Sequence, residues 1–217
     1  MKYDAILFDY DGTVADSIAD IAFAANRALR LAGLPERDEA EYRTFAGSGA
    51  GVLLRRAAPA GTGEDTLRTL YDDYVAYYAD HANDRSRPYD GVPEMLDALK
   101  EAGLKLAVIS NKPDAAVQPG VKRFFAPWLT LAVGEKPGVR RKPCPDMLET
   151  AAAEMGVSLP RCLYVGDTEV DLETARAAGI ACAAVTWGFR TREQLLGAGA
   201  GLLFDSPAEL TAFILEA

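Results

Sequence analysis

Two aspartates stand one residue apart directly behind a short apolar run, Ala5-Ile6-Leu7-Phe8. An apolar run that ends in Asp9-Tyr10-Asp11-Gly12 predicts a buried strand followed by a turn, because glycine tolerates the dihedral angles that a tight turn needs. Two carboxylates this close repel each other unless a cation joins them, and their oxygens favour a hard ion such as Mg2+. Taken alone, the pattern is equally compatible with an ordinary Asx turn after a strand.

Polar side chains also follow two later apolar runs. As with Asp9, they come where the predicted strand ends. Residues 104–109 lead into Ser110-Asn111, and residues 162–165 lead into Gly166-Asp167. Because the carboxyl ends of parallel strands lie along one edge of an open α/β sheet, we expect these side chains beside Asp9. The sequence therefore predicts one polar cluster at that edge.

A further carboxylate and a lysine complete this predicted cluster. Asp171 lies four residues after Asp167, on a predicted helix 169–178, and so falls about one turn away on the same side. So many close carboxylates cannot all ionise without a cation, which again predicts Mg2+. Lys142 precedes Pro143 in a proline-stiffened loop and is a suitable point charge for a phosphate or a carboxylate. Each of these residues alone also fits a purely structural role, such as a helix cap or a solvated loop.

The elements that must position this cluster alternate regularly after residue 93. Strand patterns are predicted at 5–8, 104–109, 129–133, 162–165, 180–185 and 201–204. Helices are predicted at 93–102, 114–125, 145–155 and 169–178, with a last one after Ser206. Apolar strands alternating with helices favour an α/β fold, in which a parallel sheet is covered on both faces.

Residues 16–87 follow a different pattern, because we find no convincing strand in them. Helical spacing is predicted at about 16–32, 37–46, 50–58 and 64–81. A turn-rich stretch, residues 85–93, resembles a linker that returns to the α/β part. We therefore expect an all-helical insertion into the α/β unit.

Composition excludes several classes of protein. The chain has 217 residues, 49% hydrophobic and 25% charged, which is ordinary globular usage. Its net charge is −9 with scattered lysines and arginines, so a nucleic-acid partner is not expected. No apolar run is long enough for a signal peptide or a membrane span. A single histidine, His81, excludes a multi-histidine zinc site, and the unpaired spacing of Cys144, Cys162 and Cys182 suits free thiols in a reducing cytoplasm.

Taken in order, these motifs resemble those of the haloacid dehalogenase-like hydrolase superfamily, over the whole chain. The matching stretches are Asp9-Tyr10-Asp11-Gly12-Thr13, Ser110-Asn111-Lys112, Lys142-Pro143-Cys144-Pro145 and Gly166-Asp167-Thr168-Glu169-Val170-Asp171. The resemblance implies a Rossmann-like core from residues 1–15 and 88–217, a helical cap from residues 16–87, and Mg2+-dependent phosphatase chemistry.

The resemblance also implies a role for each residue. Asp9 would be the nucleophile that forms an aspartyl-phosphate, and Asp11 would protonate the leaving alcohol and then deprotonate the attacking water. The groups implied to hold Mg2+ are Asp9, the backbone carbonyl of Asp11, Asp167 and, directly or through water, Asp171. The groups implied to hold the phosphoryl oxygens are Ser110, the Asn111 backbone and Lys142.

Within the superfamily, three stretches are similar to bacterial phosphoglycolate phosphatases, which makes 2-phosphoglycolate the first expected substrate. They are residues 47–57, residues 110–114 and Thr186-Trp187-Gly188-Phe189-Arg190. The backbone amides of the loop Gly47-Ser48-Gly49 could approach a small anionic leaving group, although a plain turn between helices fits as well. Two departures stand out: Tyr10 replaces a common aliphatic residue, and Gln118-Pro119-Gly120 is expected to shorten its helix.

Other functions remain open at this point. A phosphomutase or a pyrophosphatase of the same superfamily would use the same Asp9 and Asp11. A haloacid dehalogenase is less favoured, because carbon–halogen displacement does not need the acid that Asp11 provides. A non-catalytic binding module would be expected to have lost these carboxylates, and the chain retains them. Candidates to meet a substrate carboxylate are Arg43, Arg55 and Arg56, and the oligomeric state is undetermined.

Overall fold

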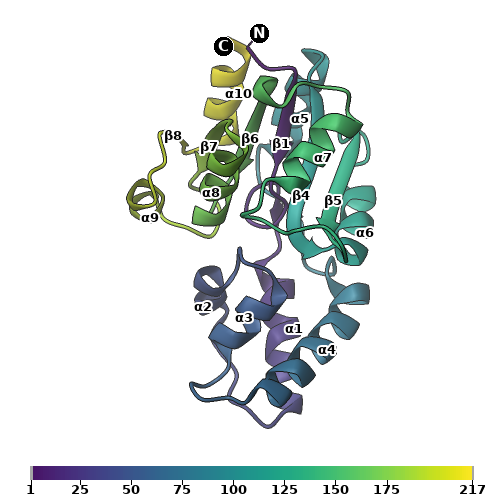
Figure 1. Cartoon of the computed structure of the whole chain (residues 1–217), viewed down its shortest axis with the longest axis vertical. Coiled ribbons are helices and arrows are strands. Elements are labelled where there is room, and N and C mark those ends of the chain that lie inside the picture. Colours follow the sequence, from purple (N-terminus) through teal and green to yellow (C-terminus); the bar gives the residue numbers. More distant parts are fainter. Residues whose placement is uncertain (1, 217) are drawn as a thin grey trace.

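A six-stranded parallel sheet forms the centre of the computed structural model, which describes residues 2–216 (Figure 1). The strand order is β5-β4-β1-β6-β7-β8, so the N-terminal strand lies in the middle. The strands are β1 Ala5–Phe8, β4 Lys105–Pro113, β5 Leu131–Glu135, β6 Cys162–Gly166, β7 Ala181–Val185 and β8 Leu202–Phe204. The predicted α/β core with a parallel sheet is confirmed.

Helices cover both faces of the sheet because consecutive side chains of β1 point to opposite sides. Ile6 and Phe8 pack in one cluster with residues of α5 Val92–Glu101, α6 Asp114–Phe124 and α10 Pro207–Glu216. Ala5 and Leu7 pack in the other, with residues of α7 Asp146–Glu154 and α8 Glu169–Ala178. A short 3-10 helix, η1 Leu159–Arg161, precedes β6, and α9 Arg192–Gly197 lies between β7 and β8 in the chain.

The register of the three central strands determines which residues meet at the carboxyl edge. Phe8 pairs with Val108 on one side and with Val165 on the other. The residues that follow these three therefore start from the same level at the carboxyl edge, although β4 itself continues to Pro113 and β6 to Gly166. The backbone N–H of Asp9 continues the pattern by donating to the carbonyl of Val165, 2.8 Å away.

Four helices form a separate body below the carboxyl edge of the sheet, and the two chain termini lie at the opposite end of the molecule (Figure 1). We call residues 16–87 the cap and the remainder the core. The cap helices are α1 Ile18–Leu31, α2 Glu39–Phe45, α3 Ala50–Ala57 and α4 Glu64–His81. They share one apolar cluster in which Leu29, Leu54 and Leu70 are fully buried.

Two short strands connect the cap to the core and were not anticipated from the sequence. Strand β2, Ala15–Asp16, pairs antiparallel with β3, Arg87–Pro88. The two crossings between cap and core are therefore hydrogen-bonded to each other. Residues of β3 fall in the stretch that was interpreted as a return linker, because two residues are too few to show a strand period.

The expectation of a shortened helix at Gln118-Pro119-Gly120 was wrong. Helix α6 runs without interruption from Asp114 to Phe124, with Pro119 inside it. A side chain at Gly120 would place its Cβ 2.1 Å from Oη of Tyr10 and 2.4 Å from Oδ1 of Asn83. The two departures from the family pattern are thus one packing feature: Gly120 makes room for the hydroxyl of Tyr10, which donates to Asn83 at 3.2 Å.

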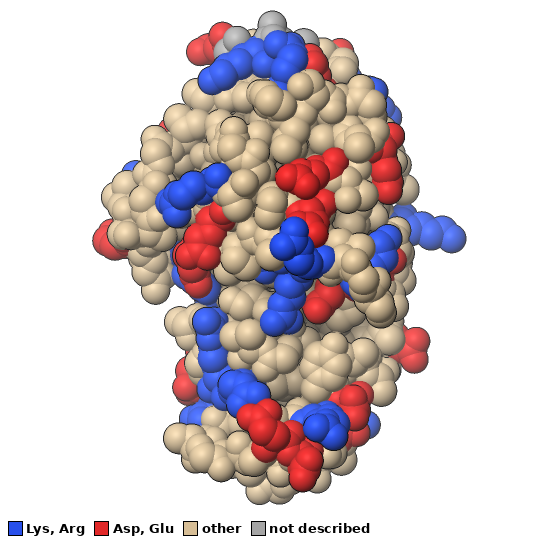
Figure 2. All heavy atoms as spheres, viewed as in Figure 1, with Lys and Arg blue, Asp and Glu red and all other residues tan. Residues whose placement is uncertain are grey.

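Basic and acidic side chains are interspersed on the face shown in Figure 2, and neither sign covers a continuous patch there. Within residues 2–216, no helix combines the length and the apolar character needed to cross a membrane. The three cysteines are free, as predicted. His81 ends helix α4 and pairs with Asp84, with 2.8 Å between Nδ1 and Oδ2.

Candidate active site

Asp9 lies at the end of β1, where the sheet edge faces the cap, and it is only 4% exposed. Its Oδ1 accepts a hydrogen bond from the N–H of Tyr10 at 2.7 Å and lies 2.9 Å from Nζ of Lys142. The ammonium group of Lys142 is buried as deeply as the carboxylate it contacts. Asp9 is therefore held in one orientation by two donors on the same oxygen.

Asp167 approaches the turn after β1 from the neighbouring strand β6. It accepts hydrogen bonds from the hydroxyl of Thr13 at 3.1 Å and from the N–H of Phe189 at 2.7 Å. Gly12 has a φ of +89° and lies so close that a Cβ there would be 2.2 Å from Oδ2 of Asp167. Glycine is required at this position for both reasons, because other residues disfavour that φ and would collide with the carboxylate.

Asp171 lies in the first turn of α8 and is completely buried. Its Oδ1 accepts hydrogen bonds from Nζ of Lys142 at 2.8 Å and from the hydroxyl of Tyr164 at 2.9 Å. Its Oδ2 accepts from the N–H of Thr168 at 3.1 Å and from the Thr168 hydroxyl at 2.8 Å. Each oxygen thus accepts two hydrogen bonds, and the side chain anchors both Lys142 and the start of α8.

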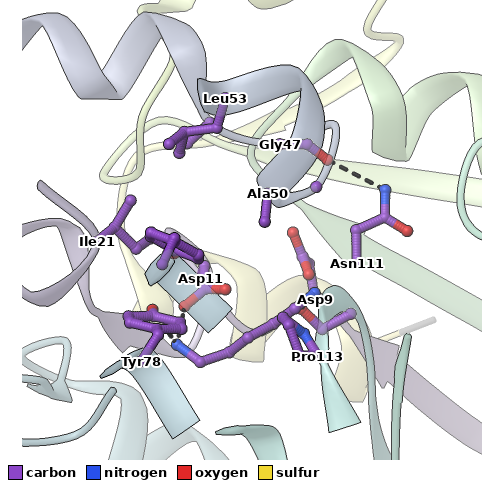
Figure 3. A pocket seen from close by; sticks show the side chains of 14 residues that line it. Asp9, Asp11, Ile21, Gly47, Ala50, Leu53, Tyr78, Asn111 and Pro113 are labelled. Carbon is purple, nitrogen blue, oxygen red and sulfur yellow. Dashed lines mark hydrogen bonds and ion pairs between the residues drawn. The ribbon is translucent and has the colours of Figure 1, made fainter. Parts of the chain in front are cut away.

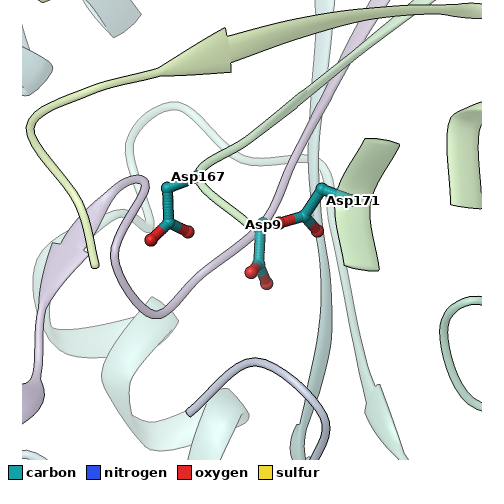
Figure 4. A group of neighbouring side chains, drawn as sticks. All are labelled: Asp9, Asp167 and Asp171. Carbon is teal, nitrogen blue, oxygen red and sulfur yellow. The ribbon is translucent and has the colours of Figure 1, made fainter. Parts of the chain in front are cut away.

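These three carboxylates form one buried group in which one oxygen from each lies within 4.8 Å of the others (Figure 4). Burial raises the pKa of Asp9 to about 7, helped by the negative charges of Asp171 and Asp11 and opposed by Lys142. Burial likewise raises the pKa of Asp167 well above its usual value, and the charges of Asp171 and Asp9 add to the shift. One lysine does not neutralise the group, so an all-oxygen donor set with this charge fits a hard divalent cation.

This electrostatic imbalance predicts that Mg2+ binding depends on pH. The pKa of Asp9 is about 7 in the folded protein against a usual 3.8, so between these values the folded state binds more protons than the unfolded chain. The free energy of unfolding of the metal-free protein should therefore fall as the pH rises from about 4 to about 7. Because Mg2+ must displace that proton, its affinity should rise by about 10-fold per pH unit well below the pKa of Asp9 and level off as the pH approaches and passes about 7.

Thermal unfolding and isothermal titration calorimetry at pH 5, 6 and 7 would measure both effects. Glu149, an acidic residue of α7 outside this cluster, provides a matched control through Glu149→Gln, which should leave the pH dependence unchanged. A Mg2+ affinity that stayed constant between pH 5 and 7 would contradict the prediction.

Asp11 is directed away from this group, towards the cap. Its Oδ1 accepts hydrogen bonds from the hydroxyl of Ser17 at 2.5 Å and from Nζ of Lys112 at 2.9 Å. The two aspartates of the first motif therefore have different surroundings: Asp9 joins the buried carboxylates, whereas Asp11 joins a hydroxyl and a lysine. That separation suits two different tasks in a reaction.

Lys112 is a site residue whose role the sequence did not reveal. Its ammonium group is buried, donates to Asp11 and to the hydroxyl of Tyr78 at 2.6 Å, and lies 5.0 Å from the ring centre of Tyr10. Its place after Ser110-Asn111 was a signal that it lies near the site. Its partner Tyr78 is on cap helix α4, and no spacing in the sequence predicts that contact.

Ser110, Asn111 and Lys142 lie close together as predicted, but their side chains make hydrogen bonds to different parts of the protein. The side chain of Asn111 accepts from the N–H of Lys142 at 2.9 Å and donates to its carbonyl at 3.0 Å. The same amide donates to the carbonyl of Gly47 in the cap at 3.2 Å. Asn111 therefore connects the Lys142 loop to the cap, while Oγ of Ser110 accepts from the N–H of Lys112 at 3.2 Å.

A pocket between core and cap is lined by some of these residues, whereas Asp167, Asp171 and Lys142 are not among its described lining residues (Figure 3). The space between the lining residues amounts to about 460 Å³ when the open solvent at its mouth is included. Core residues supply its polar side: Asp9, Asp11, Ser110, Asn111 and Lys112. Cap residues supply its mainly apolar and aromatic side: Ile21, Ala46, Gly47, Gly49, Ala50, Leu53, Tyr74 and Tyr78. Ser48 is not among the described residues that line this pocket, although its neighbours Gly47 and Gly49 are.

The cap arginines that could have met a substrate carboxylate do not line this described pocket. Arg43 donates to the carbonyl of Gly188 at 3.1 Å. Arg55 pairs with Glu64 on the exposed side of the cap, and Arg56 donates to the carbonyls at the end of α2. Among the described lining residues, Lys112 is the one cationic side chain.

Comparison with known proteins shows what this chain is similar to. A sequence model of the family described as haloacid dehalogenase-like hydrolase matches residues 6–185. The chain is 34% identical to an N-acetylmuramic acid 6-phosphate phosphatase of Pseudomonas aeruginosa, over 97% of this chain and 94% of the relative. It is 32% identical to a phosphoglycolate phosphatase of Mannheimia succiniciproducens, over 98% of this chain and 99% of the relative.

Solved structures resemble this chain over nearly its whole length. One from Lactobacillus delbrueckii subsp. bulgaricus superposes with a TM-score of 0.94 at 34% identity, over 99% of both chains. CbbY from Rhodobacter sphaeroides, in complex with phosphate, gives a TM-score of 0.74 at 27% identity over 96% of both chains. The chain therefore belongs to the haloacid dehalogenase-like hydrolase family.

Proposed function

We propose that the protein is a Mg2+-dependent phosphatase that hydrolyses a small phosphomonoester through an aspartyl-phosphate on Asp9, with 2-phosphoglycolate as the first candidate substrate. The observation that carries this proposal is the contrast between two adjacent aspartates on one pocket wall. Asp9 is fixed beside two buried carboxylates and Lys142, whereas Asp11 faces the cap beside Ser17 and Lys112. One is placed to attack phosphorus and the other to exchange a proton with the leaving group.

The reaction balances with these two residues. A carboxylate oxygen of Asp9 forms a bond to phosphorus while the bond from phosphorus to the leaving oxygen breaks, and that oxygen takes a proton from Asp11. A water molecule then gives a proton to Asp11 and attacks phosphorus, which releases phosphate and restores Asp9. Ser17 and Lys112 would keep the Asp11 carboxyl directed at the pocket during both steps.

The metal would be held by Asp9, by the backbone carbonyl of Asp11 and by Asp167. Mg2+ supplies positive charge that offsets the negative charge of the transferring phosphoryl group. Asp171 would act through water, because its two oxygens already accept hydrogen bonds from Lys142, Tyr164 and Thr168. Ser110, the Asn111 backbone and Lys142 would hold the phosphoryl oxygens, and the position of Ser110 and Asn111 on the pocket wall supports this assignment.

The cap would exclude water and select the leaving group. Its helices supply the apolar side of the pocket, and Gly47 and Gly49 place the backbone of the loop Gly47-Ser48-Gly49 next to the core. A small leaving group such as glycolate would lie between the docked cap and the core, where Lys112 is the one cationic side chain among the described lining residues available to meet its carboxylate.

A second candidate, N-acetylmuramic acid 6-phosphate, is favoured by two observations. A relative that shares 34% identity over nearly the full chain is named for that substrate. The cap wall of the pocket is apolar and aromatic, its described lining residues include no arginine, and Lys112 is already paired with Asp11. Such a wall also suits a sugar ring.

A panel of phosphorylated metabolites with Mg2+ tests the proposal. We expect release of inorganic phosphate, with kcat/KM for the preferred ester about 10-fold or more above that of other phosphomonoesters. The panel should contain both candidates, an aryl phosphate, pyrophosphate and a hexose 1-phosphate. Isomerisation of the hexose phosphate without stoichiometric phosphate release would overturn hydrolysis in favour of a phosphomutase, and preferential cleavage of pyrophosphate would overturn the ester preference.

A further inference from the structure

The segment Trp187–Arg190, which follows β7, touches the Asp9 turn, the Asp167 carboxylate and the cap. The indole N–H of Trp187 donates to the carbonyl of Thr13 at 3.0 Å. At Gly188 a Cβ would lie 2.2 Å from the carbonyl oxygen of Gly12 and 2.4 Å from Oδ2 of Asp167. Since no side chain fits there, this segment lies directly against the proposed metal-binding end of the sheet.

The next two residues contact the cap. The N–H of Phe189 donates to Asp167 at 2.7 Å, while its side chain is buried in the apolar cluster of the cap helices. The guanidinium of Arg190, whose side chain is 6% exposed, donates to the carbonyls of Arg43 and Ala46, the latter at 2.9 Å. Glu169 holds the guanidinium from the core side, at 2.7 Å and 3.0 Å.

The carbonyls that Arg190 contacts lie at the C-terminal end of α2, where a helix leaves carbonyl groups without partners and carries partial negative charge. The buried guanidinium of Arg190 at that end donates hydrogen bonds to these carbonyls and offsets their partial negative charge. Residue 46 is also the point where the chain enters the loop Gly47-Ser48-Gly49, and Ala46, Gly47 and Gly49 all line the pocket. Arg190 therefore contacts the stretch of backbone that leads directly into the cap side of the pocket.

We propose that Trp187–Arg190 couples metal binding at Asp167 to docking of the cap, with Arg190 as the positioning residue that holds the end of α2 and the following loop against the core. The proposal rests on the proposed function, since it assigns Asp167 to the metal. A second hydrogen bond joins the same two parts, with the donor in the cap: the side chain of Arg43 donates to the carbonyl of Gly188. Because one backbone segment serves both sites, whatever fixes Asp167 favours the docked cap, and a docked cap favours metal binding to the same extent.

Arg190→Gln tests the coupling, because it removes the positive charge and the several N–H donors of the guanidinium group while keeping a polar side chain. We expect amide hydrogen exchange in residues 39–50 to become about 10-fold faster, while exchange in β1, β4 and β6 stays unchanged. The Mg2+ concentration for half-maximal binding should rise about 3-fold to 10-fold, and KM for an aryl phosphate should rise more than kcat falls. Arg190→Lys, which keeps the charge, should recover part of each effect.

The matched control is Arg161→Gln, which breaks a bidentate pair with Asp4 at the far end of the same sheet. The coupling would be overturned if Arg190→Gln changed neither the amide exchange of residues 39–50 nor the Mg2+ affinity more than Arg161→Gln does. Faster exchange in those residues with unchanged Mg2+ affinity would overturn it as well, since Arg190 would then only fasten the cap. Hydrogen exchange and Mg2+ titration need no turnover, so the coupling stays testable even if the wild-type protein hydrolyses no phosphomonoester.

Discussion

Asp9→Asn is expected to lower kcat for an aryl phosphate in the presence of Mg2+ by about 10⁴-fold or more. The amide that replaces the carboxylate is a poor nucleophile, and no other described carboxylate lining the pocket is in the same position: Asp11 is turned towards Ser17 and Lys112. The measurement is steady-state phosphate release, compared with the wild type at saturating Mg2+. Undiminished turnover in this variant would refute a covalent mechanism at Asp9.

Asp11→Asn is the matched control, because it removes a carboxylate from the same turn and keeps Asp9, the proposed nucleophile. Its activity loss should depend on the leaving group: large for an alkyl phosphate, whose alkoxide needs a proton, and smaller for p-nitrophenyl phosphate, whose phenolate does not. In Asp9→Asn the loss should be similar for both esters. The metal-free Asp9→Asn protein should also unfold at a higher temperature than the wild type at pH 8, since it no longer buries that negative charge.

The core of the site could be predicted from the sequence because it depends on strand register. Asp9, Ser110 and Asp167 each come after an apolar run, and because Phe8 pairs with Val108 and Val165, the ends of the three runs lie at the same level or one residue from it. Asp171 then follows from the periodicity of α8. For these residues, the hydrogen bonds between the parallel strands determine both where each apolar run lies in the sheet and where the polar residue after it lies in the fold.

The cap side of the site could not be predicted in the same way. Tyr78 meets Lys112, and Arg190 meets the end of α2, only because the helical insertion docks on the sheet edge at a particular angle. Nothing in the spacing of α4 or of Thr186-Trp187-Gly188-Phe189-Arg190 encodes that angle. The error at Pro119 has a related cause: proline weakens a helix locally, but packing of α6 against Tyr10 and the sheet retains it.

Lys142→Met should reduce both stability and activity strongly. The ammonium group is buried, lies 2.9 Å from Asp9 and 2.8 Å from Asp171, and donates to Tyr164 at 2.9 Å. Burial alone would lower the pKa of Lys142, but the two carboxylates raise it above its usual value, so the side chain is charged at neutral pH. Removing it leaves carboxylates buried without their cation, which costs about 3–5 kcal/mol of unfolding free energy in the metal-free protein.

Urea denaturation with and without Mg2+ measures this effect, and the double variant Lys142→Met/Asp171→Asn identifies its cause. Deleting one carboxylate together with the lysine should recover part of the lost stability, because less uncompensated charge remains buried. Activity should stay about 10²-fold or more below wild type in both variants, since Lys142 would also hold a phosphoryl oxygen. Equal stability of the single and double variants would contradict a charge-balancing role, whereas recovery of stability without recovery of turnover would separate the structural task of Lys142 from its catalytic one.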